Sequence, residues 1–104
     1  MNVFSWLSAH FPASPRPELV FLNQTRAYNE TKDCVTFWGF DKTFEISFDL
    51  SGDELQRISP HEAKDESSIL RAFDGNRTLI ERMAVAAHAS SRQRRHRLPS
   101  PTIT

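Results

Sequence analysis

The sequence predicts an α+β domain in which an antiparallel three-stranded sheet is covered on one face by helices. Residues 44–50 alternate strictly between apolar and polar side chains, which is typical of a strand with one buried face. Apolar side chains then recur at helical spacing between positions 69 and 87. A period of two followed by a period near 3.6 predicts a sheet face that a long helix can cover.

The chain of 104 residues is long enough for one domain with a modest core. Hydrophobic residues make up 38% of it, and eight phenylalanines supply much of the area that can be buried. We expect residues 19–98 to form the domain and residues 99–104 a tail. Residues 1–18, which include three prolines, are expected to be a flexible extension or a segment that docks on the domain or a partner.

Three segments are predicted to be strands because they are rich in β-branched and aromatic residues. These segments are about residues 19–22, 34–40 and 43–50. The second and third are separated by a short connection, which predicts an antiparallel hairpin. Residues 23–33 are polar and are expected to form a loop.

The strand at residues 34–40 is apolar on both faces. Val35 and Phe37 can face the core, but Trp38 and Phe40 then point to the opposite side. Such a strand needs a second cover, which can be the N-terminal extension, the end of a helix or another copy of the chain. Large aromatic side chains anchor protein interfaces, so Trp38 and Phe40 are the candidate interface residues.

Two helices are predicted after the hairpin. Ser51 and Glu54 have the spacing of a capping box, which starts a short helix at residues 52–58. A long helix is expected over about residues 66–91. Gly75 lies away from its apolar stripe, so we expect a continuous helix, with a break at Gly75 as the alternative. The stripe consists of Ile69, Leu70, Phe73, Ile80, Met83, Ala84 and Ala87.

The C-terminal segment is basic and suggests an alternative function. Arg92, Arg94, Arg95 and Arg97 can contact nucleic-acid phosphates, or can simply solvate a helix end and favour its dipole. That segment lacks the aromatic residues on which bases stack. The formal net charge of zero also argues against a general nucleic-acid binder. Weak nucleic-acid binding therefore ranks below protein association.

No motif in the sequence indicates catalysis, a metal or a cofactor. The four histidines are scattered, and glycine-rich phosphate loops and nucleophile motifs are missing. Cys34 is the single cysteine and is expected to be a small buried side chain. No apolar run is long enough to span a membrane, and the N-terminus lacks the basic region of a signal peptide. We therefore expect a cytoplasmic, non-enzymatic protein.

Several motifs in order along residues 19–98 resemble a family of short bacterial proteins known as domain of unknown function 1488. The motifs are Asn23-Gln24-Thr25-Arg26-Ala27-Tyr28-Asn29, Phe37-Trp38-Gly39-Phe40-Asp41, Glu45-Ile46-Ser47-Phe48 and Leu70-Arg71-Ala72-Phe73-Asp74-Gly75-Asn76-Arg77, with Ile80. The resemblance implies a small α+β fold and brings no established activity. The chain departs from the family pattern in its N-terminal extension, at His88-Ala89 and in its final residues.

Three polar residues in these motifs are candidate site residues of unknown role. Asp74 and Arg77 are three apart on the predicted helix, where an ion pair is the simplest interpretation and a polar ligand site the alternative. Arg26 is expected in a loop, where it can clamp that loop to the sheet edge. The leading functional hypothesis is a bacterial accessory domain that associates with itself or with a protein partner through Trp38 and Phe40.

Overall fold

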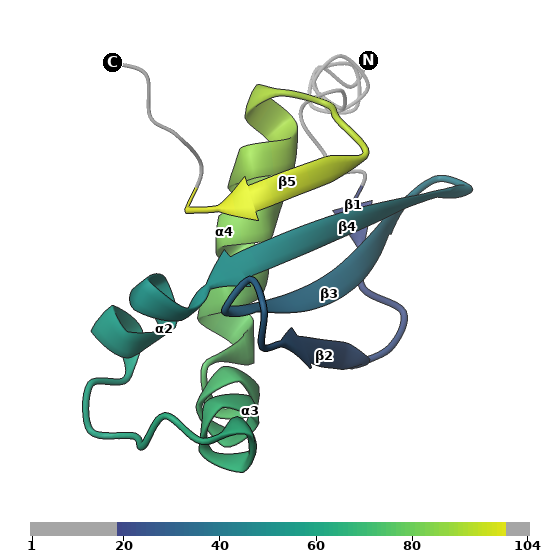
Figure 1. Cartoon of the computed structure of the whole chain (residues 1–104). Helices are drawn as coiled ribbons and strands as arrows, with labels where there is room; N and C mark the ends of the chain where they lie inside the picture. The colour runs from purple at the N-terminus through teal and green to yellow at the C-terminus, as the bar shows by residue number, and fades with distance from the viewer. Residues whose placement is uncertain (1–18, 100–104) are drawn as a thin grey trace, which may run out of the picture.

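The computed structural model describes residues 19–99, which form an α+β fold with five strands in one mixed sheet and three helices (Figure 1). The predicted α+β class is confirmed, but the prediction of three antiparallel strands is wrong. The predicted extension at residues 1–18 and the end of the tail lie outside the described residues. The elements are β1 (Leu19–Val20), β2 (Arg26–Asn29), β3 (Cys34–Asp41), β4 (Phe44–Ser51), α2 (Gly52–Ile58), α3 (Glu66–Gly75), α4 (Arg77–Ser90) and β5 (Arg95–Leu98).

The centre of the sheet is the predicted hairpin of β3 and β4. The two strands pair antiparallel along their whole length, from Cys34 opposite Ser51 to Asp41 opposite Phe44. Lys42 turns the chain with a positive φ of 61°. At mid-strand, Phe37 and Phe48 are opposite each other and their rings stack with centroids 5.3 Å apart. The alternation in the sequence therefore sets the observed register.

The sheet gains two strands that the sequence does not predict. β2 pairs antiparallel with β3 on the same edge as β1, and β5 pairs parallel with β4 on the other edge. Both are short and rich in polar residues, so their strand propensity is low. Backbone pairing with a strong neighbouring strand defines them instead. β1 in turn is shorter than predicted and ends at Val20.

Local capping sets the start of α2 and of α3. Ser51 caps α2, which has the predicted bounds, and its Oγ accepts the N–H of Glu54 at 3.0 Å. Asp65 caps α3 in the same way, with its Oδ2 accepting the N–H of Ser68 at 3.2 Å. These bonds satisfy N–H groups that have no partner within the first helical turn.

The predicted continuous helix is wrong, because the chain forms α3 and α4 with a break at Asn76. Asn76 has φ −116° and ψ 19°, outside the helical region, and serves as both the end of α3 and the start of α4. Its side-chain Nδ2 donates to the carbonyl of Ala72 at 2.8 Å, which stabilises the break. Asparagine favours such local bonds, so the break lies one residue after Gly75.

Replacing Gly75 with alanine is expected to stabilise the protein by about 0.5–1 kcal/mol. The glycine φ is not positive, and a Cβ built there meets no atom within 4 Å. Alanine therefore reduces the entropy of the unfolded chain without a clash. Chemical denaturation of both proteins measures the change, with Gly39→Ala as a matched control. A Cβ added at Gly39 would lie 3.0 Å from side-chain carbons of Leu19 and Phe21, so alanine there should stabilise less than alanine at Gly75.

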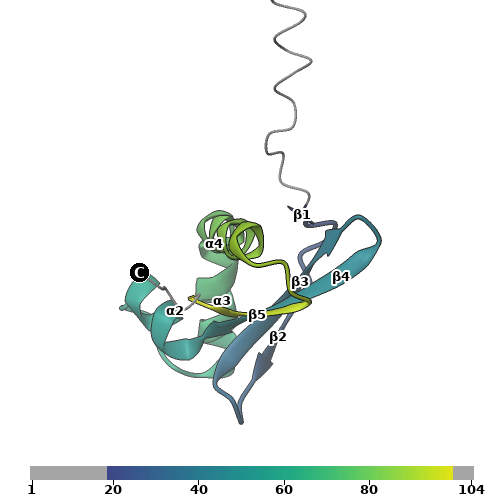
Figure 2. The same cartoon turned by 90° about the horizontal axis from the view of Figure 1, so that it is seen from above.

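The three helices lie on one face of the sheet and enclose the core (Figure 2). Phe73 of α3 packs edge-on against Phe37 at 5.2 Å, and Ile80 and Ala84 of α4 are fully buried. The predicted arrangement of a sheet face under a helical cover is therefore observed. Phe44 is an exception at the hairpin end, where it is 52% exposed.

Candidate functional site

The candidate interface residues lie on the sheet face that carries no helix. Trp38 and Phe40 are alternate positions of β3 and therefore point to the same face, and both side chains are half-buried. Val20 of β1 pairs with Phe40 and is 49% exposed. No helix of the described chain covers these three side chains, since α2, α3 and α4 all lie on the other face (Figure 2). We call this surface the open face.

The rest of the open face is polar and well ordered by hydrogen bonds. Asp49 of β4 is buried and accepts the Thr36 hydroxyl at 2.7 Å. The same carboxylate pairs with Arg95 of β5 at 3.3 Å, and Arg95 also donates to the Ser47 hydroxyl at 3.3 Å. Arg97 follows on the same side of β5, opposite Asp49. The apolar strip of β1 and β3 thus borders a polar strip of β4 and β5.

The four predicted arginines do not form one surface. Arg95 and Arg97 belong to the open face, as described above. Arg94 lies over the Phe44 ring with its guanidinium carbon 5.0 Å from the centroid, and Arg92 is 3.9 Å from Asp41. Those two arginines line a shallow cavity of about 200 Å³ between the hairpin end and the end of α4. The sequence could not separate the two pairs because β5 is not predicted.

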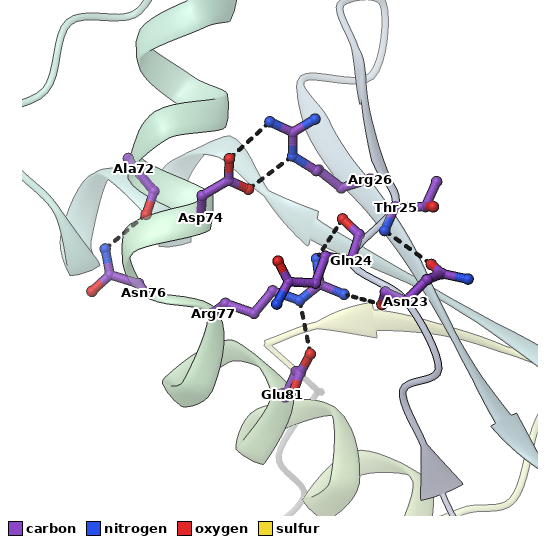
Figure 3. A network of polar contacts seen from close by, with 9 residues as sticks. All are labelled: Asn23, Gln24, Thr25, Arg26, Ala72, Asp74, Asn76, Arg77 and Glu81. Atoms are coloured by element: carbon purple, nitrogen blue, oxygen red, sulfur yellow. Dashed lines mark hydrogen bonds and ion pairs between the residues drawn. The ribbon is translucent and has the colours of Figure 1, made fainter.

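Arg26 and Asp74 form the ion pair that the sequence assigned to Asp74 and Arg77. The Arg26 Nε and Nη2 atoms each donate to one carboxylate oxygen of Asp74 at 2.8 Å (Figure 3). Arg26 is the first residue of β2 and does not lie in a loop as predicted. Its ion pair ties that strand to the end of α3. The predicted pairing of Asp74 with Arg77 is wrong, because the break at Asn76 turns Arg77 away from Asp74.

Arg77 is a buried structural cation. Its guanidinium donates to Glu81 Oε2 at 2.7 Å and to the backbone carbonyls of Gln24 and Asn23 at 3.2 and 3.3 Å (Figure 3). It also lies over the Phe37 and Phe73 rings, within 6 Å of each centroid. One side chain thus connects α4, the β1–β2 connection and the core. Its polar atoms are occupied by the protein itself, which favours a structural role over ligand binding.

A buried chain of three titratable side chains was not predicted. His88 of α4 contacts Asp41 of β3 through Nε2 at 2.8 Å and His96 of β5 through Nδ1 at 3.0 Å. His88 and His96 are 5% and 7% exposed. The contact with His88 lowers the pKa of Asp41, and burial followed by the charge of His88 lowers the pKa of His96. No sequence spacing reveals this chain, because its members belong to three different elements.

The remaining candidate features have simple structural explanations. Cys34 is buried as predicted, and burial raises the pKa of its thiol, so it stays protonated. A cavity of about 210 Å³ lies between α2 and α3, where the Tyr28 hydroxyl donates to Asp33 at 3.1 Å. Residues 19–99 contain no group of three side chains placed to hold a metal ion. None of the described helices is long and apolar enough to cross a membrane.

Comparison with known proteins identifies the family. No curated protein matches the chain. A crystal structure of a protein of unknown function from the DUF1488 family of Shewanella loihica PV-4 has a similar fold, with a TM-score of 0.72 and 13% identity. The match covers 84% of this chain and 98% of that one. The family model described as "Protein of unknown function (DUF1488)" matches residues 19–97. The chain therefore belongs to the DUF1488 family.

Proposed function

We propose that the protein is a non-enzymatic accessory domain that associates with a second copy of itself through the open face. The observation that carries the proposal is the apolar strip of Val20, Trp38 and Phe40 on a sheet face without a described helical cover. Burying one large aromatic ring removes about 150–250 Å² from water, which favours association by a few kcal/mol. When two copies pack with their open faces together, each copy buries the apolar strip of the other.

The charges on the open face favour a second copy over an unrelated protein. Asp49 and Arg95 satisfy each other within the chain. Glu45, opposite Phe40, and Arg97, opposite Asp49, form no ion pair with another residue of the described range. They lie toward opposite ends of β4 and β5. A two-fold axis through the apolar strip would bring Glu45 of one copy toward Arg97 of the other.

The area of the open face indicates a weak dimer. β3 and β4 have eight residues each, β5 has four, and β1 and β2 have two and four, which at a rise of about 3.3 Å and a strand spacing of about 4.8 Å give a face of about 400 Å². Two such faces bury about 800 Å² in total, which lies in the range of weak and transient interfaces. We therefore expect reversible association with a dissociation constant on the order of micromolar or weaker.

Sedimentation velocity over a range of protein concentrations tests the proposal. The wild-type protein is expected to shift from monomer to dimer, and the double variant Trp38→Ala, Phe40→Ser is expected to stay monomeric. Phe44→Ser is the matched control, because Phe44 is an aromatic side chain of the same hairpin that is exposed but lies on the helix-covered side of β4. Circular dichroism shows whether each variant is folded. A wild-type protein that stays monomeric throughout contradicts the proposal.

Single-stranded nucleic acid is the second candidate, on the same face. The supporting observation is that β5 places Arg95 and Arg97 on the same sheet face as Trp38 and Phe40 of β3, with β4 between the two strands. Aromatic side chains next to arginines suit base stacking and phosphate contact. Asp49 and Glu45 balance those two positive charges, which favours protein association. A salt-sensitive change in Trp38 fluorescence with an oligonucleotide, measured in a Trp6→Phe background, would favour this candidate instead.

A further inference from the structure

The His88–His96 pair holds a limited number of protons because of its hydrogen bonds. The Nε2 of His96 faces the Nδ1 of His88 at 3.0 Å. His88 donates through Nε2 to the carboxylate of Asp41. The bond to Asp41 needs a proton on His88 Nε2, and the contact between the two rings is a hydrogen bond only when one of its two nitrogens carries the proton. Only one proton fits between His88 Nδ1 and His96 Nε2, so the two rings can hold at most one positive charge while this contact is kept.

A second charge on the pair has no place in this geometry. It would put an N–H on both of the facing nitrogens, which are 3.0 Å apart, and would turn their hydrogen bond into a repulsion. The His96 ring stacks on Phe48 at a centroid distance of 5.1 Å, and that ring offers no acceptor for an N–H. Both histidines are almost fully buried, so water solvates an added charge poorly.

The other charged groups near the pair do not relieve this repulsion. Asp41 of β3 already accepts from His88, and its lowered pKa keeps it ionised in mild acid. Arg92, which follows α4, and Lys42, in the β3–β4 turn, also act on Asp41 and are positive. Arg94 is directed to the Phe44 ring. β4 presents Phe48 to His96, with no titratable group.

β5 is attached to the rest of the fold mainly through β4 and α4. It is a four-residue edge strand, and it pairs with β4 alone. Its inward side chains are His96 and Leu98, and its outward pair is Arg95 and Arg97. His96 therefore makes the polar contact that joins β5 to α4.

We propose that the Asp41–His88–His96 chain makes β5 an acid-releasable edge strand, which leaves β4 when the two histidines together take up a second proton. Release would expose the backbone edge of β4 and remove Arg95 and Arg97 from the open face. This inference does not depend on the proposed self-association, because it concerns contacts within one chain.

The direction of the pH dependence follows from the environment of His96. Burial and the charge of His88 lower its pKa in the folded chain, so the chain with β5 released binds more protons just below about pH 6.5. The docked state therefore loses stability relative to the released state as the pH falls below that value toward the lowered pKa of His96. The carboxylates of Asp41 and Asp65 titrate lower still, which separates this step from general acid unfolding.

Amide hydrogen exchange of the full-length protein, followed by NMR between about pH 7.5 and pH 5, tests the proposal. The reporter is the Ser47 amide, which donates to the Arg94 carbonyl at 2.9 Å and so reports on the start of β5. Its protection factor, corrected for intrinsic exchange, is expected to fall at least tenfold in acid. The Gly52 amide, which bonds to the Asp33 carbonyl, should keep its protection.

Two variants decide whether the histidine pair is responsible. His96→Gln can still accept from His88 but does not titrate, so its Ser47 protection should be constant over the range. His61→Gln changes an exposed histidine and should behave like the wild type. Unchanged Ser47 protection in the wild type, or an equal fall in His96→Gln, overturns the proposal. If His96→Gln lacks protection of the Ser47 amide at every pH, the NMR titration of the His96 ring in the wild-type protein decides. The proposal is contradicted if the β5 resonances do not change over the same pH range as the His96 ring.

Discussion

Replacing Arg77 with alanine is expected to lower the free energy of unfolding by about 3 kcal/mol. The substitution leaves the carbonyls of Asn23 and Gln24 and the carboxylate of Glu81 without their donor. It also opens a cavity beside the Phe37 and Phe73 rings, over which the guanidinium lies. Urea denaturation followed by circular dichroism measures the loss.

Two further variants separate the causes of the Arg77 effect. Arg77→Met keeps most of the apolar stem and loses the hydrogen bonds, so it should recover part of the packing. Arg82→Ala removes an exposed arginine from the same helix and should change stability by less than about 0.5 kcal/mol. An Arg77→Ala protein as stable as the wild type would show that Arg77 is not a structural residue.

The Phe73→Ala substitution is expected to cost about 3–5 kcal/mol, because it empties the centre of the contact between sheet and helices. Phe73 is fully buried and packs against Phe37 at 5.2 Å. Small domains have a small free energy of unfolding, so a loss of this size unfolds a large share of the molecules when the wild type is at the lower end of that range. Differential scanning calorimetry checks the effect.

Phe44→Ala makes the same chemical change at a phenylalanine that is 52% exposed. Its effect should stay below about 1 kcal/mol, since it removes a contact with Arg94 and little buried area. Equal losses at Phe44 and Phe73 would mean that the helices do not form the principal cover of the sheet.

The strongest local patterns predicted the fold best. The alternation of residues 44–50 gave the β3–β4 hairpin, and the Ser51–Glu54 capping box gave α2 with its observed bounds. The helical stripe predicted the burial of Phe73 and Ile80. These features depend on periodicity and capping, which are local properties of the sequence.

The features that the sequence did not predict depend on contacts between distant residues. β2 and β5 are strands because β3 and β4 offer them backbone partners, while their own residues have little strand preference. The helix breaks at Asn76, which bonds back to Ala72, and the break directs Arg77 toward Gln24 rather than Asp74.

The candidate site was predicted in part. Trp38 and Phe40 were identified from their position on the second face of one strand, which the observed register places away from the helices. To predict that Arg95 and Arg97 lie on that face, one must know that residues 95–98 form a strand beside β4. To predict the Asp41–His88–His96 chain, one must know how β3, α4 and β5 are placed relative to one another. Neither arrangement has a signal in residue spacing.

The proposed contact of two open faces is tested most directly by isotope-filtered NOE spectroscopy on a mixture of labelled and unlabelled protein. The account predicts intermolecular NOEs from the Trp38 and Phe40 rings, with Val20 of the other copy among the contacts. Rings that show no intermolecular NOE at a concentration of about 0.5 mM, well above a micromolar dissociation constant, would contradict it. NOEs from the same rings to residues 3–11 of their own chain would identify the N-terminal segment as the cover instead.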